Sequence, residues 1–137
     1  MAGIGSPIVV GYVETPEGRA ALDRAIAEAQ QRGARLVVIN SHRGGAALDR
    51  DTAVELDDSM DDVHLLLHDT GVEHEVRQLV RGVDPAEDLV AVAEEIDADL
   101  IVIGLRRRSP VGKLILGSNA QQILLEASCP VLAVKAP

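Results

Sequence analysis

The chain has 137 residues, of which 47% are apolar and 26% are charged, and its formal net charge is −9 at pH 7. This length and composition indicate one globular domain over residues 1–137 rather than a disordered chain. The acidic balance, with one tyrosine and no phenylalanine or tryptophan, argues against nucleic acid as a partner, because phosphates need basic surfaces and bases need stacking rings.

Membrane and secretory signals are not expected from the sequence. No apolar run reaches the roughly 18 residues that a transmembrane helix needs, so we expect no membrane partner. The N-terminal stretch MAGIGSPIVVG lacks the basic region of a secretory signal. The single Cys129 cannot form an internal disulfide, which suits a reducing compartment. We therefore expect a cytoplasmic location.

The first part of the chain alternates between apolar runs and helical patterns. Residues 7–13 form a continuous apolar run, typical of a strand that is buried on both faces of a sheet. A helix is expected next, because Thr15 can cap its N-terminus, Pro16 suits its first position and Gly33 can end it. Residues 35–41 are the second predicted strand.

The middle of the chain continues this alternation. A second helix is predicted over residues 51–69, with Met60, Val63 and Leu67 along its apolar side. Residues 72–80 alternate in polarity, which indicates a partly exposed edge strand. A third helix is expected to open at Asp84, and residues 100–104 are predicted to form a fourth, buried strand.

The last predicted elements are a helix and a strand. Ser118 can cap a helix that buries Ile123, Leu124 and Ala127, and residues 130–135 are the fifth strand. The resulting order, βαβαβαβαβ, predicts parallel strands joined by right-handed helical crossovers. We therefore expect an α/β, doubly wound, five-stranded parallel sheet in the order 3-2-1-4-5 with helices on both faces.

The stretch between Gly104 and Ser118 is the best candidate for a binding site, because ligands of such sheets lie at the carboxyl ends of the strands. It contains three consecutive arginines at 106–108 and leads into a predicted helix. Backbone N–H groups of Gly117, Ser118 and Asn119, with the helix dipole, favour an anion there. The alternative is that Ser118 only caps the helix and that the arginines form a solvated loop.

The same stretch resembles a motif of the universal stress protein family: glycine, two residues, glycine, nine residues, then Gly-Ser or Gly-Thr. Gly104, the nine residues 108–116 and Gly117-Ser118 stand at this spacing. The residues before the motif (99–104), after it (119–135) and near the start (8–11) are also similar to the family. This resemblance to single-domain, UspA-like members implies an adenine nucleotide alpha hydrolase-like fold that holds ATP, AMP or another adenine nucleotide between strands one and four.

Two positions depart from the family's pattern. Arg107 stands at the motif's second glycine, close to the phosphates in ATP-binding members, and Val13 stands at an aspartate near the adenosine. The resemblance also implies main-chain contacts to adenine near Ser41. The nucleotide-binding residues implied in this way are Val13, Ser41, Gly104, Arg107, Gly117, Ser118 and Asn119.

Two interpretations of the function follow from the resemblance. The favoured one is a stress-response regulatory or interaction domain with a degenerate adenine-nucleotide site, in which Arg107 blocks the phosphate path. The alternative is an ATP- or AMP-binding protein that acts as a nucleotide-dependent switch. A third and weakest interpretation is an enzyme with weak ATPase activity, but no general base stands at the loop and no Ser-His-Asp or Cys-His grouping is found. The apolar last strand, between Pro130 and Lys135, predicts a homodimer, because relatives pair their subunits through it.

Two further features of the sequence have simple explanations. His64 and His68 share a helix face, but a zinc site needs three or four ligands and no third is nearby, so no metal is expected. Cys129 beside Pro130 is interpreted as a small residue that fills space in the core.

Overall fold

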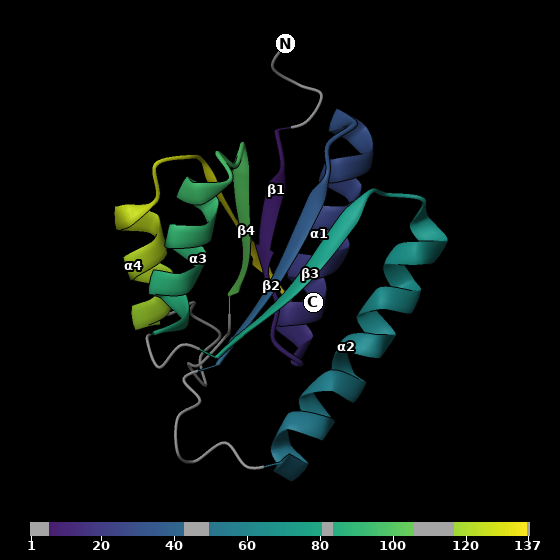
Figure 1. The fold of residues 1–137 in the computed structure, drawn as a ribbon. Helices are drawn as coiled ribbons and strands as arrows, with labels where there is room; N and C mark the ends of the chain where they lie inside the picture. Colours follow the sequence, from purple (N-terminus) through teal and green to yellow (C-terminus); the bar gives the residue numbers. More distant parts are fainter. Residues whose placement is uncertain (1–5, 43–49, 81–83, 106–116, 137) are drawn as a thin grey trace.

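The computed structural model describes residues 6–42, 50–80, 84–105 and 117–136 (Figure 1). Five strands pair in parallel in the order β3-β2-β1-β4-β5, which confirms the predicted topology. The elements are β1 (Ile8–Gly11), α1 (Pro16–Arg32), β2 (Leu36–His42), α2 (Arg50–Thr70), β3 (His74–Val80), α3 (Pro85–Glu95), β4 (Leu100–Leu105), α4 (Ser118–Glu126) and β5 (Val131–Lys135).

Helices cover both faces of the sheet and divide the core into two layers (Figure 1). α1 and α2 pack on one face, where Val10 and Val38 meet Met60 and Leu67. α3 and α4 pack on the other face, which Val9 of β1 reaches. Successive strand residues point to opposite faces, so a strand covered on both sides must be apolar throughout. This explains the continuous apolar run that predicted β1.

The ends of α1 form as the sequence predicts. The backbone N–H of Gly18 donates to Thr15 Oγ1 over 3.1 Å, and Pro16 occupies the first turn. Gly33 ends the helix with φ of 65°, a left-handed conformation that glycine adopts without steric cost, and its N–H donates to the Ala29 carbonyl. The capped first turn holds α1 beside the carboxyl end of β1.

Two expectations for α4 are wrong. The helix begins at Ser118, so its N-cap is Gly117, which has no side chain to cap it. Leu124 is 42% exposed, whereas Ile123 is only 5% exposed. Adjacent helical residues point about 100° apart, and only the Ile123 side of this short helix faces the core. Within the described ranges, none of the helices combines the length and apolarity of a membrane span.

Candidate functional site

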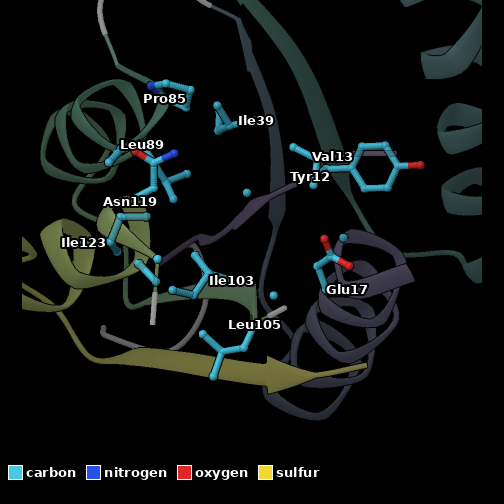
Figure 2. A pocket seen from close by; sticks show the side chains of 16 residues that line it. Tyr12, Val13, Glu17, Ile39, Pro85, Leu89, Ile103, Leu105, Asn119 and Ile123 are labelled. Carbon is cyan, nitrogen blue, oxygen red and sulfur yellow. The ribbon is translucent and has the colours of Figure 1, made fainter. Parts of the chain in front are cut away.

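A pocket of about 260 Å³ lies at the carboxyl ends of β1 and β4 (Figure 2). The first turn of α1 forms one wall, and α3 with α4 forms the opposite wall. The chain passes from β1 to β2 on one side, and β4 lies on the other side of β1. The pocket therefore lies at the topological switch point, where doubly wound sheets bind their ligands.

Four residues that the sequence predicts for the site line this pocket together, namely Val13, Gly104, Gly117 and Asn119. They come from the β1–α1 loop, from β4 and from the start of α4. Ser118 is exposed at the first position of α4 and is not among the lining residues.

The two other predicted site residues are not tested by the structure. Ser41 belongs to β2, where its backbone pairs in register with Leu79, but its side chain lies outside the described part of the chain. Arg107 lies outside the described residues altogether. Their roles in binding stay predictions from the sequence.

Two glycines let the first turn of α1 approach the sheet closely. A Cβ atom on Gly104 would overlap the backbone of Glu17, and a Cβ atom on Gly18 would overlap the Val13 carbonyl. Any other residue at either position would push α1 away from β1 and β4. The glycines therefore bring the N-terminus of α1 to the pocket, and Gly104 has a packing role whether or not it touches a ligand.

The lining of the pocket is mainly apolar. Ile39 and Ile103 provide side chains from the sheet, and Leu89 and Ile123 provide side chains from the helical layer of α3 and α4. Such a lining with few polar groups is typical of small-molecule sites and suits a flat aromatic base.

The phenol of Tyr12 points away from the pocket in Figure 2, into the core beneath α1 and α2. Burial raises the pKa of this phenol, and the nearby charge of Glu14 raises it further, so Tyr12 is neutral at physiological pH. Tyr12 therefore contributes to the core and supplies no polar side chain to the pocket.

The N-terminus of α4 supplies a polar element to the opposite wall. Gly117, Asn119 and Ala120 all line the pocket there. Gly117 accepts from the N–H of Gln121 over 3.0 Å, whereas the first N–H groups of any α-helix lack partners within the helix. Together with the helix dipole, these groups favour a negatively charged ligand at this end of the pocket.

Reasoning from the sequence missed Glu17 as a pocket residue. Its position in the first helical turn after β1 was the available signal, because that turn lies at the carboxyl edge of the sheet. The apolar residues Ile39 and Leu89 were missed as well, since an apolar residue that lines a site looks like any core residue.

The remaining candidate groups lie away from the pocket. Burial raises the pKa of the Cys129 thiol, and the charge of Asp99 adds to this, so the residue is not a reactive thiolate. His64 lies near His74 of β3, with ring centroids 6.4 Å apart, and both His64 and His68 are exposed. Among the residues that the structure describes, no three His, Cys, Asp or Glu side chains are grouped to hold a metal.

The fold and this pocket define a doubly wound α/β protein with a ligand site at its switch point. The sequence model of the Universal stress protein family matches residues 6–135. A universal stress protein from Mycolicibacterium smegmatis is 50% identical over 128 residues, which cover 93% of this chain and 96% of the relative. The chain therefore belongs to the universal stress protein family.

Solved structures agree with this assignment. A universal stress protein from Archaeoglobus fulgidus superposes with a TM-score of 0.83 at 38% identity, covering 94% of this chain and 98% of that one. A second A. fulgidus universal stress protein, solved in complex with dAMP, has a TM-score of 0.78 at 32% identity and covers 94% and 97% of the two chains. The resemblance thus extends over nearly the whole length of each.

Proposed function

We propose that this chain is a non-catalytic regulatory protein of the stress response that binds an adenine nucleotide in the pocket between β1 and β4. The observation that carries the proposal is the position of an apolar pocket directly beside the N-terminus of α4. The apolar lining takes the base, and the helix N-terminus takes the phosphate. The A. fulgidus relative solved with dAMP supports this ligand class.

The nucleotide site differs from the family's pattern at two positions, and both changes weaken binding. Val13 offers an apolar side chain, 47% exposed, where the family has an aspartate. Arg107 stands where the family's motif has its second glycine, and we expect a longer side chain at this position to leave less room for a triphosphate. We therefore expect AMP to bind more tightly than ATP.

Titration calorimetry with AMP and ATP on the wild type and on Arg107→Gly tests this proposal. We expect the substitution to strengthen ATP binding, because it reopens the phosphate path. If the wild type binds ATP tightly and the substitution weakens it by roughly 1–3 kcal/mol, Arg107 pairs with the phosphates instead. If neither nucleotide binds to either protein, the nucleotide proposal is wrong.

A second candidate function is an interaction module that acts as a dimer in the cytoplasm without nucleotide. The observation that favours it is the place of β5 at an edge of the sheet, with Val131 and Leu132 only half-buried. Antiparallel pairing of two β5 strands would join two copies into a symmetric homodimer. Such a dimer is also compatible with nucleotide binding, so the titration above decides between the two candidates.

A further inference from the structure

We propose that Glu17 binds the ribose hydroxyls of the nucleotide and thereby supplies the carboxylate that Val13 does not. This inference rests on the proposed nucleotide site and names a specificity-determining residue within it. Glu17 lines the pocket from the first turn of α1, and Figure 2 shows its carboxylate on the same side of the pocket as Val13. The two residues are four positions apart, across the turn that joins β1 to α1.

The backbone of Glu17 is held in place from two directions. Gly104 of β4 lies so close that a Cβ atom there would be 3.1 Å from the Glu17 Cβ and would overlap its carbonyl. On the other side, Gly18 packs against the Val13 carbonyl and donates its N–H to Thr15. A backbone fixed in this way keeps the Glu17 side chain at the pocket.

The charge of Glu17 sets the kind of group that it can bind. Among the described residues that line the pocket, it carries the only charged side chain. Its place in the first turn of α1 puts its negative charge at the positive end of the helix dipole. An ionised carboxylate only accepts hydrogen bonds, so it selects a ligand group that donates them.

The two walls of the pocket therefore prefer opposite ends of a nucleotide. Glu17 selects a group that donates hydrogen bonds, whereas the N-terminus of α4, around Gly117 and Asn119, attracts a phosphate. α1 and α4 pack on opposite faces of the sheet, and Figure 2 shows Glu17 and Asn119 on opposite sides of the pocket. This arrangement orients the ligand with its phosphate at α4 and its sugar diol at α1.

Titration calorimetry with AMP and its deoxy analogues tests the inference. The ligands are AMP, 2′-deoxyAMP, 3′-deoxyAMP and 2′,3′-dideoxyAMP, and the proteins are the wild type, Glu17→Gln and Glu17→Ala. For the wild type we expect loss of both hydroxyls to weaken binding by about 10- to 100-fold, the range for hydrogen bonds to a charged group. For Glu17→Ala the difference in affinity between AMP and the dideoxy analogue should fall to about twofold or less, and Glu17→Gln should give an intermediate difference.

Asp23→Asn is the matched control, because it removes a negative charge from the exposed side of the same helix, where Asp23 pairs with Arg19 at 3.2 Å. It should keep the full discrimination between AMP and the dideoxy analogue. Thermal unfolding of each variant verifies that it is folded, which we expect because Glu17 is only partly buried.

Three results would overturn the inference. The first is that the wild type binds AMP and 2′,3′-dideoxyAMP with the same affinity. The second is that the wild type and Glu17→Ala lose the same amount of affinity when the hydroxyls are removed. The third is discrimination between AMP and inosine monophosphate that disappears in Glu17→Ala, which would place the adenine amine at Glu17 instead of the ribose. The first two leave the nucleotide proposal intact, whereas failure of AMP to bind the wild type overturns both.

Discussion

The two edges of the sheet differ in the charges that they carry. On β3, Glu75 accepts hydrogen bonds from Arg77 (Nε–Oε1, 2.7 Å) and from Arg35 (Nη1–Oε2, 3.1 Å). On β5, the sequence VLAVK has one charge, at Lys135. Charged side chains on an edge strand oppose pairing with another chain, and apolar edges invite it. The comparison teaches that, of the two outer strands of the described sheet, β3 is the one protected by charge and β5 the one whose composition favours pairing.

The register of β5 shows which of its backbone groups are available for pairing. The N–H of Ile101 in β4 donates to the Pro130 carbonyl over 3.0 Å, and Ile101 is in register with Val131. Amide groups point to alternate sides along a strand, so Leu132 directs its backbone groups to β4. Val131 and Ala133 therefore direct theirs to the open edge.

The largest expected effect comes from Ala133→Pro, which removes an outward N–H without breaking the ladder to β4. A symmetric dimer loses this donor in both copies, and the proline rings obstruct the approach of the second strand. We expect the dissociation constant of the dimer to rise by about 100-fold. Sedimentation velocity at micromolar concentration measures this change.

The control is a proline at the opposite edge. The N–H of Leu36 donates to the Glu73 carbonyl over 2.9 Å, so His74, the first residue of β3, directs its amide away from β2. His74→Pro should leave the oligomeric state unchanged. The edge comparison fails if the wild type sediments as a monomer, or if Ala133→Pro stays dimeric.

Both edges could be predicted from the sequence, although by different signals. Residues 72–80 alternate in polarity, as an edge strand with one exposed face must, and β3 lies at an edge. The apolar run of β5 suits a central strand as well as an edge strand. Its position at the other edge is therefore predicted only from its place as the last strand in chain order. The sheet order 3-2-1-4-5 was predictable because crossover rules leave few alternatives.

The pocket was predictable in part. Strand order alone places Val13, Gly104 and Gly117 at the switch point, and the structure brings them together. The contact of Glu17 with Gly104 could not be predicted, since it joins residues 87 positions apart through the packing of α1 on β4. The exposure of Leu124 was missed for a related reason: it depends on which side of α4 meets the rest of the fold.

An intermediate effect is expected when the charged edge is made apolar. The double variant Glu75→Val, Arg77→Val gives β3 a surface like that of β5. We expect species larger than the dimer to appear and to increase with protein concentration, because each dimer then has further edges that can pair. Light scattering after size-exclusion chromatography measures their mass.

Arg19→Val with Asp23→Val is the matched control, since it replaces an exposed ion pair of α1 by the same residue type without touching an edge. If both double variants associate to the same degree, surface hydrophobicity is the cause, and the charges on β3 have no special role. If neither associates, β3 is protected by something other than these charges.

The smallest expected effect is a pH dependence of stability that arises at the β3 edge. The hydrogen bond from Arg77 is the largest cause that holds the pKa of Glu75 below its ordinary value, and Arg35 contributes in the same direction, although partial burial opposes both. A carboxyl whose pKa is depressed on folding stabilises the protein fully above its unfolded pKa, about 4.3 for Glu. This stabilisation is lost as the pH falls through the folded pKa. Because the Glu75 side chain is 39% exposed, solvent screening limits this stabilisation to less than about 1 kcal/mol.

Urea unfolding of the wild type and of Glu75→Gln tests this prediction. At about pH 7 the wild type should have the higher free energy of unfolding, and the difference should shrink below about pH 4.3, as Glu75 becomes neutral like glutamine. Asp23→Asn, which breaks the more exposed ion pair with Arg19, should differ little from the wild type in unfolding free energy. A gap for Glu75→Gln that stays constant or widens in acid would mean that the ion pairs of β3 do not stabilise this edge.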